Sequence, residues 1–150
     1  MSGQPLHLSP AECTCFRIRG AARRVTQIYG RHLAPTGLKI SQFSLLGFVS
    51  AEGPVSIGRL SELLATDRTT LTRNLRPLEE RGYVLLAPER RHRSRMLTLT
   101  AAGHAALREA LPLWEAAQGT IRRRLGERRW PAVQAALAEL TAEAQPAPHP

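Results

Sequence analysis

The chain has 150 residues, a net charge of +9 at pH 7 and a sequence pI near 11.3. This length suits one core-bearing domain, alone or with an oligomerisation element, and the charge favours a polyanionic partner. No apolar run approaches the roughly 20 residues that cross a bilayer, and the N-terminus lacks the apolar stretch of a signal peptide, so we expect a cytoplasmic protein.

A basic helix is predicted near the N-terminus. Prolines gather at both ends of the chain, and we expect residues 1–10 and 146–150 to be disordered. From residue 11 to about residue 33, apolar positions recur at helical spacing but are not confined to one stripe. A helix that is apolar on more than one side needs more than one neighbour. The breaker Ala34-Pro-Thr-Gly37 ends it, so residues 11–36 form a separate N-terminal element.

Two shorter helices follow. Ser41 is expected to cap a helix that ends near Gly53, and Ser56 to cap one that runs to about Leu64. The polar turn of residues 65–67 then leads directly into another helix. Two short helices joined by a tight turn are typical of the helix-turn-helix, whose second helix enters the major groove of DNA.

The helix that follows Asp67 has two chemically different faces. Asp67 is a good N-cap, and Gly82 is the usual residue after a helix end. Leu71, Leu75 and Leu78 share one apolar stripe. The opposite face carries donors and small hydroxyls, namely Arg68, Thr69, Thr72, Arg73 and Arg76. Bases near a helix N-terminus oppose its dipole, which favours an external anion such as DNA over the alternative of a solvated basic face.

A β-hairpin is predicted directly after this helix. Residues 83–87 and 96–100 are rich in apolar and β-branched side chains, which favours two strands. The connection between them is basic, with Arg90, Arg91, Arg93 and Arg95. Beside a duplex, such a loop would cross phosphates or enter the minor groove; a solvated charged turn is the alternative. Residues 38–100 therefore predict a winged helix-turn-helix DNA-binding domain.

Helices are also predicted over residues 101 to about 125 and, after a break at 127–131, to about residue 144. Thr100 should cap the first of these, and Pro112 should kink or interrupt it. The fold class is thus mainly α with a small β-hairpin wing. The economical role for residues 11–36 and 101–145 is dimerisation with a second copy. A two-fold dimer would place two recognition helices on one face of a duplex, about one helical turn apart.

The order and spacing of these motifs resemble the MarR family of bacterial transcription regulators. The resemblance covers roughly residues 12–143 and is most specific over residues 56–64, 67–84 and 97–103. It implies a homodimer that binds a pseudo-palindromic double-stranded operator, usually as a repressor, and that a small molecule or an oxidant releases. Family wings usually carry Asp-x-Arg near the tip, whereas Arg91, His92 and Arg93 stand there in this chain.

The resemblance also places an effector pocket where the dimerisation helices meet the DNA-binding domain. The candidate lining residues are Arg17, Phe43, Phe48 and Trp114. An apolar wall with one arginine would suit a small aromatic or phenolic acid. The alternative is that these side chains are ordinary core.

The pair Cys15-Phe16 resembles the first helix of family members that sense organic hydroperoxides, in which tyrosines activate a reactive cysteine. Here Tyr29 comes fourteen residues after Cys15, roughly on the same helix face, and Arg19 one turn after it would favour a thiolate. Cys13 would be the resolving thiol. A thiol-based oxidant sensor is therefore an alternative function, against inert packing of both cysteines.

We predict no cofactor, no metal site and no catalytic residue. Cys13, Cys15, His7, His32 and His104 lack zinc-like spacing. A Gly-rich phosphate loop, a nucleophile elbow and a paired-acid signature are also missing from the sequence. We expect a DNA-binding protein that is not an enzyme, with a non-specific architectural DNA-binding protein as a third alternative.

Overall fold

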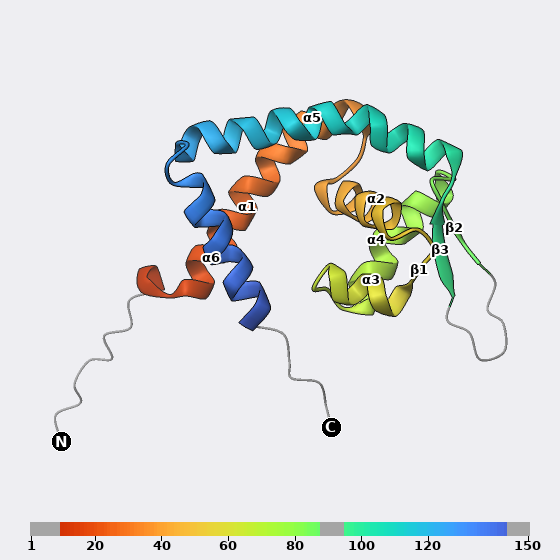
Figure 1. Ribbon diagram of the computed structural model, residues 1–150, viewed down its shortest axis with the longest axis horizontal. Helices are drawn as coiled ribbons and strands as arrows, with labels where there is room; N and C mark the ends of the chain where they lie inside the picture. The colour runs from red at the N-terminus through yellow and green to blue at the C-terminus, as the bar shows by residue number, and fades with distance from the viewer. Residues whose placement is uncertain (1–9, 88–94, 144–150) are drawn as a thin grey trace, which may run out of the picture.

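A computed structural model of the chain describes residues 10–87 and 95–143. The long helix α5 runs along one side of the molecule, with α1 and α6 near one of its ends and the other helices and the sheet near the other (Figure 1). The α-helices are α1 (Thr14–Leu33), α2 (Ile40–Glu52), α3 (Ile57–Leu63), α4 (Arg68–Glu80), α5 (Ala101–Leu125) and α6 (Trp130–Glu143). The shorter elements are the 3-10 helices η1 (Pro10–Glu12) and η2 (Ala34–Thr36) and the strands β1 (Val55–Ser56), β2 (Val84–Leu86) and β3 (Met96–Leu99).

The predicted fold class, mainly α with a small β wing, is confirmed, but the sheet has one strand more than predicted. The three antiparallel strands lie in the order β1-β3-β2. Val55 of β1 pairs with Leu97, and Val84 of β2 pairs with Leu99. Two residues are too few to show an alternating pattern, and β1 owes its form to pairing with β3. None of the helices in the described ranges is long and apolar enough to cross a membrane.

The start of α2 differs from the prediction. The helix begins at Ile40, after Lys39, so Ser41 is not its cap. Instead, the Gln42 side-chain Oε1 accepts a hydrogen bond from the Lys39 N–H at 3.0 Å. The Ser41 hydroxyl donates to Asn74 Oδ1 of α4 at 3.1 Å. Ser41 therefore links the beginning of α2 to α4.

Helices α5 and α6 also correct the sequence-based bounds. Thr100 caps α5 as predicted, and its Oγ1 accepts the Gly103 N–H at 3.0 Å. The predicted interruption at Pro112 is wrong, because α5 continues through it as one bowed helix (Figure 1). A proline removes one helix hydrogen bond, and the buried Ala110 and Ala117 hold α5 on either side of it. Helix α6 includes Pro131 in its first turn, where a missing N–H costs nothing.

One apolar core joins α1 and α5 to helices α2, α3 and α4 and to the sheet. Its most fully buried side chains are Leu33, Leu45, Leu46, Val49, Leu60, Leu71, Leu78 and Leu97. By contrast, Leu137 and Leu140 of α6 are 47% and 44% exposed. Helix α6 thus presents apolar side chains that the described part of the chain does not cover.

The turn between α3 and α4 contains a backbone conformation that is costly for its residue. Ala65 has a φ of 46°, in the left-handed region. Its N–H donates to Glu62 O at 3.1 Å, and the Thr66 N–H donates to Ser61 O at 3.0 Å, which closes the end of α3. Glycine is the usual residue at this position because a Cβ costs about 1–2 kcal/mol there.

We expect Ala65→Gly to stabilise the folded protein. The relieved strain should exceed the entropy that glycine adds to the unfolded chain, for a net gain of up to about 1 kcal/mol. Thermal unfolding should show a melting temperature higher by about 2–4 °C. Gly82→Ala is the matched control, since Gly82 has a φ of 67° and the substitution should lower the melting temperature. A lower melting temperature for Ala65→Gly would contradict the assigned strain.

Candidate nucleic-acid interface

Helix α4 is rotated so that its two faces meet different surroundings. Leu71, Leu75 and Leu78 are buried, as their spacing predicts. The side chains predicted to contact DNA are all exposed on the remaining surface: Arg68, Thr69, Thr72, Arg73 and Arg76. The structure therefore presents these five residues together on the solvent side of one helix.

The carboxylate of Asp67, directly before α4, is hydrogen-bonded to the first turn of the helix. Asp67 Oδ1 accepts the Thr70 N–H at 2.8 Å, and Oδ2 accepts the Thr70 hydroxyl at 2.7 Å. These hydrogen bonds from Thr70 lower the pKa of Asp67 below its usual value. Both oxygens are engaged by Thr70, so the acid acts as the predicted helix cap, and within the described residues it forms no salt bridge with an arginine.

The end of α4 confirms the predicted role of Gly82. Gly82 has a φ of 67°, its N–H donates to Glu79 O at 2.8 Å, and the Tyr83 N–H donates to Leu78 O at 2.9 Å. This pair of bonds is the Schellman arrangement that satisfies the last carbonyls of a helix. The chain then passes directly into β2, so a hydrogen-bonded turn joins α4 to the sheet.

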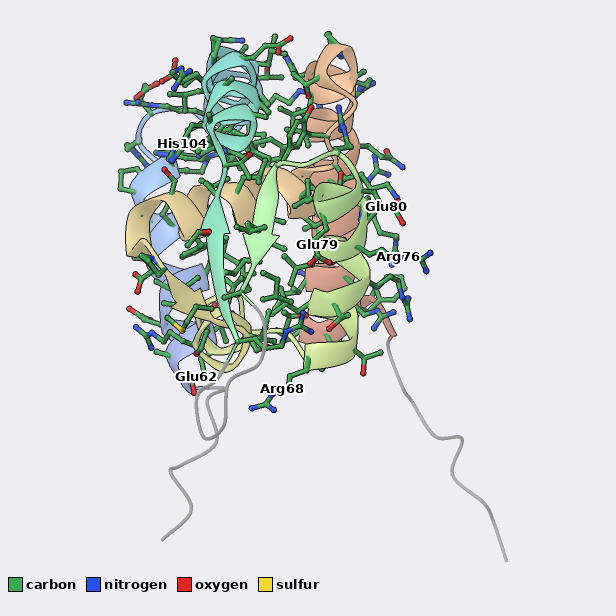
Figure 2. All side chains as sticks on the ribbon, turned by 90° about the vertical axis from the view of Figure 1, so that its right-hand side faces the viewer. Glu62, Arg68, Arg76, Glu79, Glu80 and His104 are labelled. Carbon is green, nitrogen blue, oxygen red and sulfur yellow. The ribbon has the colours of Figure 1, made fainter. Side chains whose placement is uncertain are left out.

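The arginines on this face differ in what holds them. Arg76 Nε lies 2.9 Å from Glu80 Oε1, although both side chains are well exposed. Arg68 extends beyond the N-terminal end of α4, whereas Arg76 points sideways next to Glu80 (Figure 2). Within residues 10–87 and 95–143, neither Arg68 nor Arg73 makes a side-chain hydrogen bond or a salt bridge. Both guanidiniums are thus available to an external acceptor.

Two further residues that the sequence argument did not assign to DNA binding lie near this face. Lys39 and Ser41 are exposed at the beginning of α2, and Ser41 contacts α4 through Asn74. A helix N-terminus favours anions such as phosphate. The signal in the sequence was the helix breaker at Gly37, which places the start of α2 immediately after it.

Of the four arginines predicted for the loop between β2 and β3, one lies within the described residues. Arg90, Arg91 and Arg93 lie outside the described residues, as does His92. Arg95 is described, and its Nε donates to Ala87 O at 3.4 Å. The Ala87 N–H also donates to Met96 O at 2.8 Å, which closes the pair of strands at the base of the loop.

The four candidate effector residues are not all brought together. Phe43 of α2 and Trp114 of α5 stack with ring centroids 5.7 Å apart and an interplanar angle of 21°. Phe48 is 37% exposed on α2. Arg17, near the start of α1, donates from Nε to Ala11 O at 2.5 Å. A shallow hollow elsewhere is lined by none of these four but by Val49, Ser50, Gly53, Pro54, Thr98, Leu99 and His104.

The candidate redox residues are separated along α1. Cys13 and Cys15 are both exposed, and Cys13 precedes α1 with an extended backbone. Tyr29 is buried, and its hydroxyl donates to Gln118 Oε1 of α5 at 2.5 Å; burial raises the pKa of Tyr29. Fourteen helical residues span about 21 Å, so Tyr29 does not reach Cys15 within one chain. Within the described ranges, no three His, Cys, Asp or Glu side chains gather as a metal site.

Helices α3 and α4, followed directly by strands β2 and β3, make up a winged helix-turn-helix. A model of the MarR family matches residues 36–94. The Mycobacterium tuberculosis transcriptional regulator MosR is 36% identical, with a TM-score of 0.80 over 91% of this chain and 98% of that one. Its complex with DNA matches at 38% identity and a TM-score of 0.80, over 89% of this chain and 96% of that one. The chain belongs to the MarR family, which comprises transcription regulators and not enzymes.

Two other relatives are more distant or longer. The transcriptional activatory protein BadR of Rhodopseudomonas palustris is 33% identical over 118 residues. Those residues make up 75% of this chain, which spans 63% of the length of BadR. The transcriptional repressor CouR, bound to a 23-mer DNA duplex, is 25% identical, with a TM-score of 0.78 over 89% of this chain and 98% of that one.

We expect Arg73→Ala to weaken sequence-specific DNA binding more than Arg76→Ala does. An arginine contact to a base is worth about 1–3 kcal/mol, or roughly 5- to 150-fold in affinity, and its loss should relax the preference for one base. Arg76 must first leave Glu80, so its net contribution should be smaller. Competitive gel shifts with a duplex selected by the wild-type protein, against random DNA, measure both. Unchanged affinity for Arg73→Ala would show that the groove assignment is wrong.

Proposed function

We propose that this MarR-family chain is a homodimeric repressor that binds a pseudo-palindromic operator and leaves it when a small aromatic or phenolic effector binds. Residues 38–100 would bind DNA, and residues 11–36 and 101–145 would dimerise. The observation that carries the proposal is the exposed face of α4, where Arg68 and Arg73 have no side-chain partner among the described residues. The exposed Thr69 and Thr72 lie on the same face. That face has the donors that phosphates and guanine edges accept.

The apolar side chains left uncovered support a dimer. Leu137 and Leu140 on α6 are exposed, as are Phe16 and Ile18 on α1. Both helices belong to the segments assigned to dimerisation. Covering such side chains with a second copy would contribute about 25 cal/mol for each Å² removed from water. A two-fold arrangement would repeat the basic face of α4 on one side of a duplex.

The effector class is inferred from an aromatic pair near the core, and the sign of regulation is compared with that of two relatives. Phe43 and Trp114 stack between α2 and α5, which gives an aromatic wall close to the core. Such a wall suits a flat ring. Among the relatives, CouR is named a repressor and BadR an activator. A reporter assay with the operator upstream of the reporter gene, with and without the protein, decides between them.

The experiment that tests the proposal is a gel shift on DNA upstream of the protein's own coding sequence, with random competitor at fixed salt. Retention of the complex in excess competitor, and its loss with an aromatic acid, are the expected results. Equal competition by random DNA would favour a non-specific architectural protein, because only the phosphate term would then operate.

An oxidant-sensing role is the second candidate, and the exposure of both thiols favours it. The Cys15 thiolate would attack an organic hydroperoxide, forming a sulfenic acid and releasing the alcohol. The Cys13 thiol would then condense with that sulfenic acid to a disulfide and release water. Cys13 stands outside α1 with an extended backbone, so helix geometry does not fix its side chain on the far side from Cys15.

We expect replacing Leu137 and Leu140 together with aspartate to yield a monomer. Two charges would oppose burial of α6 against a second copy, while the chain's own core is untouched because both side chains are exposed. Sedimentation velocity gives the mass, and circular dichroism checks the fold. The control is Ala132→Asp with Ala135→Asp, because both residues are exposed and lie on the other side of the same helix. A folded double variant that stays dimeric would place the interface elsewhere.

If the thiol mechanism operates, Cys15→Ser should abolish release by cumene hydroperoxide and leave DNA affinity unchanged. Serine cannot form a sulfenic acid, and Cys15 is remote in sequence from α4. Gel shifts before and after peroxide, and again after reductant, measure both properties. Cys13→Ser should still respond but should not recover through a disulfide. Peroxide release from Cys15→Ser equal to that of the wild type would make the cysteines structural.

A further inference from the structure

We infer that Arg81 is a positioning residue for DNA recognition, one that fixes the orientation of α4 relative to both dimerisation segments. This inference rests on the proposed dimer that reads two half-sites. Arg81 directly follows α4 and is exposed. Its Nη2 donates to Thr36 O at 3.0 Å and its Nη1 to Gly37 O at 3.4 Å. Both carbonyls belong to the turn that ends α1.

That turn is rigid on the side of α1. The 3-10 helix η2 follows Leu33 without a gap, and Leu33 is fully buried in the core. The Thr36 hydroxyl donates to Leu33 O at 2.8 Å, and the Gly37 N–H donates to Ala34 O at 3.1 Å. A displacement of the end of α1 would therefore be carried directly to the two carbonyls that hold Arg81.

The other side of Arg81 leads to α5. Its guanidinium carbon lies 4.7 Å from the centre of the Tyr83 ring. The Tyr83 carbonyl accepts the Thr100 N–H at 3.0 Å, and the Thr100 hydroxyl donates to Gly82 O at 2.6 Å. At Gly103, in the first turn of α5, an added Cβ would lie only 2.0 Å from Tyr83 O. The segment after α4 is thus held tightly against the start of α5.

The contacts of Arg81 lie at the C-terminal end of α4, whereas Arg68 lies at its N-terminal end. Glu79 and Glu80 lie toward that end, away from Arg68 (Figure 2). One guanidinium contacts both the turn after α1 and a tyrosine bound to α5. Arg76, one turn earlier, differs because its described partner, Glu80, is on α4 itself. In the proposed dimer, the dimerisation segments (residues 11–36 and 101–145) set the distance between the two copies of α4. Arg81 fixes the orientation of α4 relative to these segments.

The property that isolates this role is tolerance to operator spacing. Duplexes selected by the wild-type protein from random DNA are compared with the same duplexes carrying one base pair more or less between the half-sites. Each base pair shifts a half-site by about 3.4 Å and by about a tenth of a turn. The readout is the ratio of the Kd for altered spacing to the Kd for selected spacing, together with the Kd for an isolated half-site.

We expect Arg81→Ala to lower the spacing ratio about fivefold, the lower end of usual coupling between sites, with the half-site Kd unchanged. Arg81→Lys should retain more of the ratio than alanine, because an ammonium can still donate to Thr36 O and face Tyr83. Tyr83→Phe is the control and should match the wild type, since the ring remains. Because Arg81 is exposed, these variants should fold, and thermal unfolding checks this. Arg81→Gln provides a second test if the Arg81→Ala variant does not fold.

Two results would overturn the inference. A folded Arg81→Ala or Arg81→Gln variant with the wild-type spacing ratio would show that Arg81 does not set the orientation of α4. Equal weakening on full and half-sites would show a phosphate contact or a general loss of stability instead. Insensitivity of the wild-type protein itself to spacing would refute the two-half-site dimer, an outcome seen before any variant is measured.

Discussion

The DNA-binding face depends on how α4 is rotated about its own axis, and three buried leucines fix that rotation. Leu71, Leu75 and Leu78 are each 0–2% exposed. Each contributes about 1.5–3 kcal/mol by leaving water. Successive residues turn by about 100° in a helix, so a shift of one position toward the C-terminus would bring Thr72, Arg76 and Glu79 into the core at a high desolvation cost. The apolar core thereby determines which side chains solvent, or a duplex, can reach.

The two ends of α4 are held by different chemistry. At the N-terminal end, the Asp67 carboxylate satisfies the free N–H of Thr70, and the preceding turn accepts strain at Ala65. At the C-terminal end, Gly82 closes the helix and Arg81 reaches the turn after α1. The N-terminal end of α4 is thus held by local contacts, whereas the C-terminal end is held by contacts with other elements. A structural change in the dimerisation segments would therefore reach α4 through the contacts of Arg81 at its C-terminal end.

Local signals in the sequence predicted the local parts of this structure. Asp67, Thr100 and Gly82 cap or close helices as expected, because each acts on backbone groups within a few residues of itself. Tertiary contacts were not predictable in the same way. Strand β1 exists because a distant strand pairs with it, and Ser41 binds Asn74 instead of capping α2.

The candidate site follows the same division. The exposed face of α4 was predictable from periodicity, and the Arg76–Glu80 pair has the i, i+4 spacing at which helix side chains meet. The contacts of Arg81 with Thr36 and Gly37 were not predictable, because these residues are more than 40 positions away. The link from Tyr29 to Gln118 joins residues 89 positions apart, and no spacing rule would have found it. The roles of the α4 side chains in DNA binding, and those of the effector and redox residues, stay predictions.

The central claim is that two copies of α4 read the major groove of one duplex. Methylation interference tests it most directly, because methyl groups on guanine N7 block contacts in the major groove. On a duplex selected by the wild-type protein, the account predicts two clusters of interfering guanines with centres about 10 base pairs apart. A single cluster, or interference confined to adenines in the minor groove, would contradict it.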